Sequence, residues 1–303
     1  MKPVKLSVII CTYNRDKYIY NVLKSIAEND FPKNRYEIVL VNNNCTDQTE
    51  KECSRFVQNF SDVDLKIFKE SNQGLSYARN RGVSEAGGDV LVYVDDDAVV
   101  NSEYLKTYAD FFETHPEVDA AGGRIDPRYE TREPDWFSKY IRQLITAKLD
   151  LGKHERRFPK GKFPGGGNAA YRKTVFDRVG LFNVELGRKG TGLIGAEEKD
   201  LFDKMTDQGI QFFYLPNAVL YHIIPDSKLT RDYFERWTYA IGKSEYLRTH
   251  SSRKKYLKRI FREIVKWGGT AVLWLRFLVC LQPKKGNKLI RFRYNVTRGL
   301  LGR

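Results

Sequence analysis

Apolar and polar residues alternate along the first 100 positions with two different periods. Short runs rich in Val, Ile, Leu and Tyr are typical of strands. They occur at residues 6–13, 36–43, 65–70 and 90–95. The stretches between them repeat apolar residues with a helical period, which predicts helices at residues 16–29, 47–60 and 75–86. Strands that alternate with helices predict an α/β fold with a mostly parallel sheet and helices on both faces.

The same kind of pattern continues beyond residue 100. The further elements that we expect are a helix at 101–115, a strand at 118–126, a helical segment near 136–150, and then strand, helix and strand at 165–173, 195–205 and 211–222. After Pro225 the pattern becomes purely helical. We therefore predict a catalytic unit over residues 1–225, divided near residue 125 into two halves, and a helical extension over residues 226–303.

Composition and charge separate these two regions further. With 41% apolar and 13% aromatic residues, the chain can form a sizeable core, which argues against disorder. The net charge of +14 is concentrated after Pro225, where 20 Lys and Arg stand against 5 Asp and Glu. The preceding residues are almost neutral. The extension is therefore the part of the chain that we expect to meet an anionic partner.

The cysteines and the N-terminal residues indicate the cellular compartment in which the protein is expected. The four cysteines (Cys11, Cys45, Cys53 and Cys280) show no CxxC spacing, which favours reduced thiols over a disulfide framework or a zinc site. The first residues, MKPVKLSVII, pass directly into a strand pattern and lack the layout of a signal peptide. We therefore expect a cytoplasmic protein.

Polar clusters follow the predicted strands at the ends where parallel sheets bind ligands. They are CTYNR after the first strand, NNNCTD after the second and DDD, Asp95–Asp97, after the fourth. Three adjacent carboxylates repel one another, so the triad is either a solvated turn or a site for a divalent cation. Mg²⁺ and Mn²⁺ prefer carboxylate and phosphate oxygens. The position at a strand end favours the cation site.

Two motifs in the second half add to this set. GGGN (165–168) allows the backbone to approach a ligand closely, although a flexible turn would have the same composition. GAEEKDL (195–201) begins a helix with several acids, which the helix dipole also favours without any catalytic role.

Taken in order, these motifs resemble a known family. SVIICTYNR, VNNNCTD, NQGLSYARNRG, YVDDD, GGGN, GAEEKDL and YH resemble the nucleotide-sugar-dependent glycosyltransferases of family 2, which have the GT-A fold. The resemblance covers roughly residues 4–224. It implies a nucleoside-diphosphate sugar as donor, with a UDP-sugar favoured, and Mn²⁺ or Mg²⁺ as cofactor.

The resemblance assigns the nucleotide to the first half of the chain. Tyr13 is placed to stack on the base, and Asn42 stands where the family usually has an aspartate that accepts the base N3–H. Asp95 corresponds to the acid that faces the ribose, with Asp96 supporting it. The full set of nucleotide-binding positions is Cys11, Thr12, Tyr13, Asn42, Arg79, Asp95 and Asp96.

The remaining positions concern the metal, the sugar and the reaction. The resemblance assigns Asp97 and His222 to the metal, and Gly166, Gly167 and Asn168 to the loop that lines the donor sugar. Glu198 corresponds to the general base, and Glu197 is its alternative because the common form is Glu-Asp. A metal on the diphosphate and one base on the acceptor side suit direct displacement with inversion.

The residue pattern of the extension indicates a binding surface rather than a catalytic site. Apolar residues recur at helical spacing over residues 256–281, with basic residues on the other side of the helix. The apolar run is too short and too interrupted to span a bilayer. We expect peripheral contact with an anionic membrane surface, the alternative being a helix packed on the catalytic body with a solvated basic side.

The expected function is transfer of a sugar to a hydroxyl of a glycan or lipid-linked acceptor at the inner face of the cell membrane. Two alternatives remain at this point. A sugar-phosphate nucleotidyltransferase shares the sheet and the metal site. Nucleic-acid binding would use the basic extension but has no recognisable motif, so we expect no nucleic-acid partner.

Overall fold

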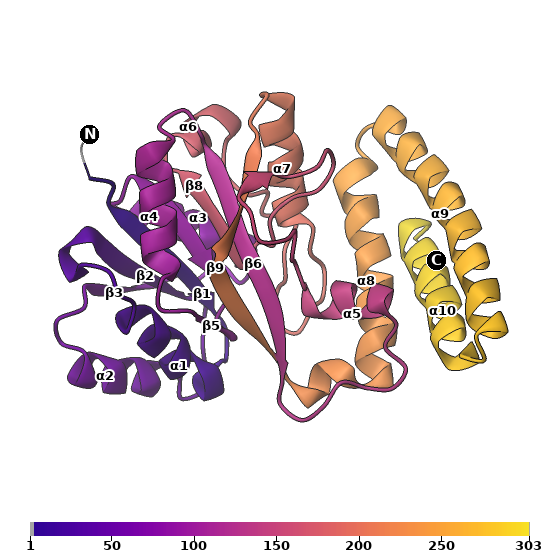
Figure 1. The fold of residues 1–303 in the computed structure, drawn as a ribbon, viewed down its shortest axis with the longest axis horizontal. Coiled ribbons are helices and arrows are strands. Elements are labelled where there is room, and N and C mark those ends of the chain that lie inside the picture. The colour runs from indigo at the N-terminus through magenta and orange to yellow at the C-terminus, as the bar shows by residue number, and fades with distance from the viewer. Residues whose placement is uncertain (1–2, 303) are drawn as a thin grey trace.

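The computed structural model describes residues 3–302, so Met1, Lys2 and Arg303 of the predicted units lie outside the described residues. Its centre is a nine-stranded sheet in the order β3-β2-β1-β4-β8-β6-β9-β5, with β7 paired to β9 (Figure 1). The strands are β1 (Leu6–Thr12), β2 (Tyr36–Asn42), β3 (Leu65–Lys69), β4 (Val90–Val94), β5 (Ala98–Val100), β6 (Ala120–Tyr129), β7 (Arg156–Arg157), β8 (Asn168–Arg172) and β9 (Phe212–Ile224).

The first four strands pair in parallel, and antiparallel pairs begin at β8. Helices cover both faces. They are α1 (Asp16–Ala27), α2 (Thr49–Asn59), α3 (Leu75–Glu85), α4 (Tyr104–Thr114), α5 (Lys139–Thr146), α6 (Val175–Val179) and α7 (Glu197–Asp207), with a short 3₁₀ helix, η1 (Lys33–Arg35), before β2. The prediction of an α/β fold with a mostly parallel sheet is confirmed.

Two hydrophobic cores follow from the alternation of side chains along the strands. In β1, Leu6, Val8 and Ile10 face the core formed with α1, α2 and α4, whereas Ile9 faces the core formed with α3, α6 and α7. All of these side chains are fully buried, as continuous apolar runs in a doubly covered sheet should be.

The stretch VLVYVDDDAVV forms two strands rather than one. β4 ends at Val94, Asp95–Asp97 form a turn, and β5 leaves β4 to pair with β9 at the other edge of the sheet. In this pairing Ala98 lies opposite His222. The acidic turn is therefore held between two distant strands, and one of them carries a predicted metal ligand.

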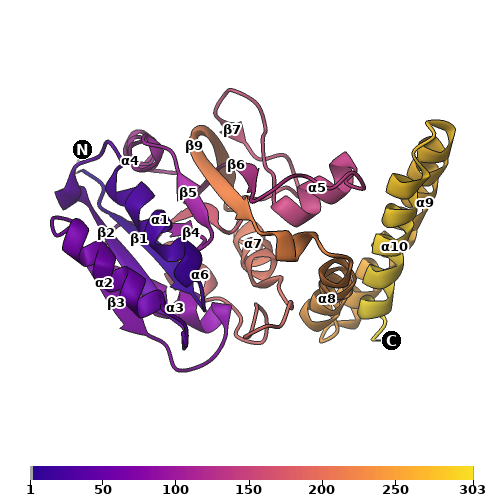
Figure 2. The same cartoon turned by 90° about the horizontal axis from the view of Figure 1, so that it is seen from below.

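Helices form the remainder of the chain. They are η2 (Asp226–Leu229), a short 3₁₀ helix, followed by α8 (Arg231–Thr249), α9 (Arg253–Val279) and α10 (Pro283–Leu300). A third apolar cluster joins α5 to α8 and α10 through residues such as Ile141, Phe234 and Phe292. Figures 1 and 2 show α9 and α10 at the end of the molecule opposite β3, with α5, α7 and α8 between.

Candidate active site

The acidic turn lies where several strand ends meet, and Asp97 is its most enclosed member. Asp97 is 5% exposed, and its carboxylate accepts a hydrogen bond from Lys228 Nζ at 2.8 Å. His222 Nε2 lies 3.3 Å from the other carboxylate oxygen. Burial alone would raise the pKa of Asp97, but Lys228 and His222 hold it well below its usual range. Asp97 is therefore a buried carboxylate that faces a cation.

The tautomer of His222 follows from its second nitrogen. Nδ1 lies 2.9 Å from the Thr146 carbonyl oxygen, which can only accept, so Nδ1 carries the proton. Nε2 lies 3.4 Å from Lys228 Nζ and 3.3 Å from Asp97 Oδ1, so it accepts from Lys228 when the ring is neutral and donates to Asp97 when the ring is protonated. Asp97 and His222 thus converge on the ammonium group of Lys228, and Arg15 Nη2 lies farther away, at 4.0 Å from the Asp97 carboxylate.

This pair fits the divalent metal that the family resemblance implies. A carboxylate and a neutral imidazole are both ligands of Mn²⁺, and a metal bound to a diphosphate takes its other ligands from phosphate and water. Within residues 3–302, no three His, Cys, Asp or Glu side chains form a metal-binding group. Asp97 and His222 would therefore hold the metal jointly with the donor, and Lys228 would have to yield its place.

The neighbouring acids connect the turn to the nucleotide-binding residues. Asp96 accepts hydrogen bonds from the Tyr13 backbone N–H at 3.3 Å and from Arg15 Nε at 3.4 Å. Burial raises the pKa of Asp96 to about 6, against the effect of Arg15. Asp96 thus ties the loop after β1 to the loop after β4. Cys11 and Thr12 end β1 beside this loop.

The glycine loop places the two halves of the site in contact. A Cβ atom added at Gly166 would lie 1.7 Å from the Glu198 carboxyl group, and one added at Gly167 would lie 2.0 Å from Asp95 Oδ2. Any side chain at either position would therefore overlap a predicted functional carboxylate. Glycine is required here for this close approach.

Arg79 orients the glutamate doublet at the start of α7. Its guanidinium group, 3% exposed, donates to Glu197 at 3.0 Å and to Glu198 at 2.5 Å. Burial raises the pKa of Glu197 to about 7, with Glu198 adding to the effect and Arg79 opposing it. Glu197 is enclosed, whereas the Glu198 side chain is 30% exposed and faces the glycine loop. Of these two glutamates, Glu198 is therefore the one that both contacts the loop and is accessible to solvent.

Three asparagines of the family motifs have their side chains engaged within the protein. Asn168 is fully buried and bonds to Tyr104, Tyr108 and two backbone carbonyl groups. Asn80 bonds to both backbone groups of Phe182. Asn42 accepts from the Cys45 N–H at 2.8 Å and donates to Glu50 at 3.0 Å. Through these hydrogen bonds, Asn168 and Asn80 support the backbone around the site.

Sequence reasoning assigned no role to Arg15, Lys228 or Ser244. Arg15 stands in the quoted motif CTYNR, and its position there was the available signal. Lys228 lies 131 residues from Asp97, in a segment that we assigned to the extension. Ser244 of α8 accepts a hydrogen bond from the Gly195 N–H at 2.9 Å and so holds the turn before α7. Residues after 225 therefore contribute to the site.

A doubly covered sheet with an acidic turn at the end of its fourth strand, a glycine loop and a glutamate-led helix is typical of the GT-A fold. The fold agrees with a solved mannosyltransferase, PcManGT from Pyrobaculum calidifontis, in complex with GDP-Man and Mn²⁺. That comparison has a TM-score of 0.64 at 18% identity and covers 100% of this chain and 89% of the other. The family model "Glycosyl transferase family 2" matches residues 7–180, more than half of the chain. The chain belongs to this family and is a glycosyltransferase, as predicted.

Two curated relatives match most of the chain. One is the glucosyl-dolichyl phosphate glucuronosyltransferase of Haloferax volcanii, 28% identical over 225 residues, covering 72% of this chain and 69% of the relative. The other is a dolichyl N-acetyl-α-D-glucosaminyl phosphate 3-β-D-2,3-diacetamido-2,3-dideoxy-β-D-glucuronosyltransferase of Methanococcus voltae, 29% identical over 284 residues, covering 89% and 77%. Some relatives are much longer, and the chain spans 19% of TarS from Staphylococcus aureus.

Proposed function

We propose that this protein is an inverting, metal-dependent glycosyltransferase that moves a sugar from a nucleoside-diphosphate sugar to a hydroxyl group of a lipid-linked or other glycan acceptor. The observation that carries the proposal is the contact of Gly167 with Asp95 and of Gly166 with Glu198. One short loop thereby separates a donor-side acid from an acceptor-side acid. The family match favours glycosyl transfer over nucleotidyl transfer.

The residues divide into binding and chemical roles. Cys11, Thr12, Tyr13 and Asn42 would surround the base, for which uracil is favoured, and Asp95 would bind the ribose. Asp97 and His222 would hold Mn²⁺ or Mg²⁺, whose charge neutralises the leaving diphosphate. Glu198 would remove the proton from the acceptor hydroxyl as that oxygen attacks the anomeric carbon. Glu197 and Arg79 would keep Glu198 oriented.

The lipid-linked acceptor is supported by both relatives described above, whose names specify dolichyl-phosphate-linked sugars. An acceptor of this kind would place the enzyme at a membrane surface. We accordingly locate it at the cytoplasmic, inner face of the cell membrane, with peripheral contact through its C-terminal helices.

A pair of isosteric substitutions tests the chemistry. Glu198→Gln retains the shape of the side chain but cannot accept a proton, so donor affinity should remain near that of the parent. Turnover should fall by a factor on the order of 10² to 10⁴. The donor is first identified by thermal shift with a panel of nucleotide sugars, with and without Mn²⁺. Turnover is then measured with that donor.

Glu197→Gln is the matched control, because Glu197 binds the same guanidinium group but is enclosed. If it abolishes turnover while Glu198→Gln does not, the base is Glu197. Intact transfer in both variants would refute a catalytic base in this cluster. A melting shift with nucleoside triphosphates but with no nucleotide sugar would instead indicate a nucleotidyltransferase.

A further inference from the structure

The helix α9 exposes its apolar residues to solvent. Eight of the fourteen exposed large apolar side chains of residues 3–302 lie between Leu257 and Leu281. Phe261 is 66% exposed, Val272 67% and Val279 83%. The seven of these positions that lie within α9, from Leu257 to Val279, follow a helical repeat of three, four and seven residues, so they form one stripe along the helix. Figures 1 and 2 show this helix at the outer edge of the molecule.

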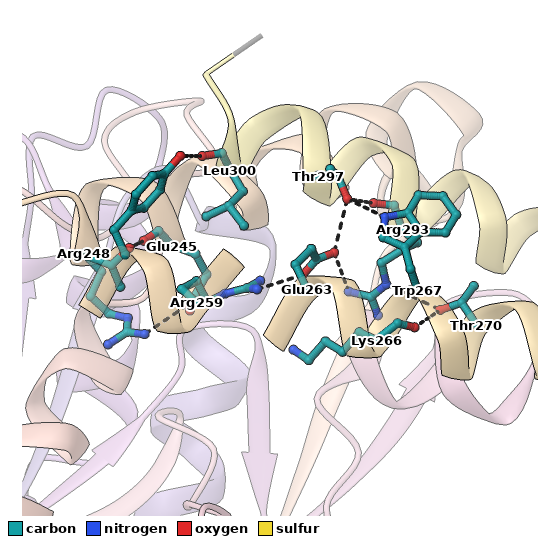
Figure 3. A network of polar contacts seen from close by, with 12 residues as sticks. Glu245, Arg248, Arg259, Glu263, Lys266, Trp267, Thr270, Arg293, Thr297 and Leu300 are labelled. Carbon is teal, nitrogen blue, oxygen red and sulfur yellow. Dashed lines mark hydrogen bonds and ion pairs between the residues drawn. The ribbon is translucent and has the colours of Figure 1, made fainter. Parts of the chain in front are cut away.

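The opposite face of α9 is buried and ionic (Figure 3). Arg259 and Glu263 are 5% and 3% exposed. Arg259 binds Glu245 of α8 at 2.9 Å and Glu263 at 2.8 Å, and Glu263 binds Arg293 of α10 at 2.9 Å. Rotating the helix to bury the apolar stripe would break these pairs and leave charges uncompensated. The network therefore fixes the orientation in which the stripe faces outward.

The charges beside the stripe have a single sign. The exposed ionisable residues of α9 are all basic, and they include Lys258, Arg262 and Arg276 along one border of the stripe. Glu263, the single acid of α9, is buried, and α10 contains no Asp or Glu. Two copies of this face would bring cations against cations, which disfavours a homodimer. An anionic bilayer complements both the charge and the apolar stripe.

A groove on the other border continues the apolar surface. It has a volume of about 530 Å³ and lies between α9 and α10, lined by Trp267, Trp274, Ile290 and Tyr294 together with Asn287 and Arg291. The indole N–H groups of Trp267 and Trp274 donate to Thr297 and Asn287 at 2.9 Å each. The ring surfaces are therefore available to hydrocarbon, which suits the boundary between head groups and acyl chains.

We propose that the outer face of α9, with the adjoining α9–α10 groove, is an in-plane binding surface for anionic phospholipid bilayers. Among residues 3–302, no helix combines the length and hydropathy that a membrane span requires. The contact would thus be peripheral, with α9 lying in the head-group region and the α/β body in the water phase. The surface is apart from the catalytic residues, so its binding is measured without any donor sugar.

Flotation of the full chain with vesicles tests this surface. Vesicles of phosphatidylcholine are compared with vesicles that also contain 30% phosphatidylglycerol, and binding is expected to the anionic ones and to weaken in high salt. Phe261→Ser combined with Val272→Ser and Val279→Ser should lower the partition coefficient by at least about tenfold. Reversal of Lys258, Arg262 and Arg276 to Glu should remove the preference for the anionic vesicles.

Substitutions at three exposed apolar residues outside α9 provide the control. Val57, Ile67 and Leu181 are 46%, 44% and 47% exposed on the catalytic body, and their change to Ser should leave vesicle binding unaltered. Equal binding by the α9 variant and the parent would overturn the proposal, and so would failure of the parent to bind anionic vesicles. A parent dimer in sedimentation velocity that the α9 substitutions dissociate would assign the face to a second copy instead. Each outcome is independent of whether the enzyme transfers a sugar.

Discussion

At the scale of single residues, Lys228 has the most specific consequence for the metal. Its ammonium group pairs with Asp97 at 2.8 Å and lies 3.4 Å from His222 Nε2, and these are the two groups that would bind Mn²⁺. A divalent ion must therefore displace it. Lys228→Met removes this competitor at similar length, so Mn²⁺ should bind about tenfold more tightly in titration calorimetry without donor, a difference of about 1.4 kcal/mol.

Two variants calibrate that measurement. Asp97→Ala should abolish the Mn²⁺ heat, because it removes the carboxylate ligand. Lys243→Met, which removes an exposed lysine of α8, should change nothing. Weaker Mn²⁺ binding by Lys228→Met would contradict competition between the lysine and the metal.

Glu197 has a pH-dependent effect on stability. Its pKa is raised to about 7 by burial, so between pH 4.5 and 7 the folded state binds a proton that the unfolded state has lost. Its contribution is therefore fully present below the unfolded pKa and is lost as the pH rises towards 7. Glu197→Gln mimics the protonated form and should stabilise the protein more at pH 8 than at pH 5, by on the order of 2 kcal/mol. Melting curves at both pH values check this, and a pH-independent difference would contradict it.

At the scale of elements, the glycine loop and α7 depend on one another. Gly166→Ala would place a methyl group on the Glu198 carboxylate, so either the loop or the side chain must shift. We expect turnover to fall by about 10²-fold, the size of effect that an ångström-scale misplacement can have. Steady-state rates with saturating donor check this.

Gly195→Ala is the control within the same site. A Cβ atom there would meet its nearest neighbour, Glu197, at an ordinary 3.7 Å. The hydrogen bond from its backbone N–H to Ser244 would also remain. Near-parental rates are expected for this variant. Equal losses in the two variants would indicate a general effect of alanine on these loops rather than contact with Glu198.

At the scale of the whole molecule, Glu245 joins the catalytic body to the extension. It is 6% exposed and binds Lys199 of α7 at 2.5 Å, Arg248 at 3.0 Å and Arg259 of α9 at 2.9 Å. Burial opposes its ionisation, but the charges of Lys199 and Arg248 lower the pKa of Glu245 to about 2. Its stabilising contribution is therefore present above the unfolded pKa and is lost as the pH falls from about 4.5 towards 2.

Glu245→Gln leaves three cations around a neutral amide and should lower the free energy of unfolding by about 3 kcal/mol at pH 7. Urea denaturation measures the change. Glu28→Gln, which removes an exposed pair with Lys24, should cost less than about 1 kcal/mol. Equal stability of the Glu245 variant and the parent would show that the extension is not held by this network.

The local pattern was sufficient to predict much of the fold. β1 to β4 and the helices between them lie within a few residues of their predicted bounds. These bounds could be predicted because apolar residues recur every second position in a strand and about every 3.6 positions in a helix, and this pattern depends on a single element. The position of Asp95–Asp97 at the end of β4 followed from the same reasoning, since the ends of parallel strands share one edge. The Glu197–Glu198 doublet was assigned by the family resemblance instead.

Other features depended on contacts between distant segments. β5 leaves its neighbour β4 to pair with β9, and Lys228 reaches Asp97 across 131 residues. Asn168, expected to line the donor sugar, is buried among tyrosines from α4. No local repeat encodes such pairs, because each requires a particular packing of whole elements.

The helix α9 illustrates which properties the sequence determines and which the tertiary structure decides. The sequence by itself determined that this segment is helical and that its apolar and basic residues lie on different sides, because these properties depend only on spacing. It did not determine which side is buried. The polar side is buried because Arg259 pairs with Glu245 of α8 and Glu263 pairs with Arg293 of α10. Each of these charges is stable in the interior only while its partner from the other helix is present. Only the tertiary structure could decide this, since the partners come from α8 and α10.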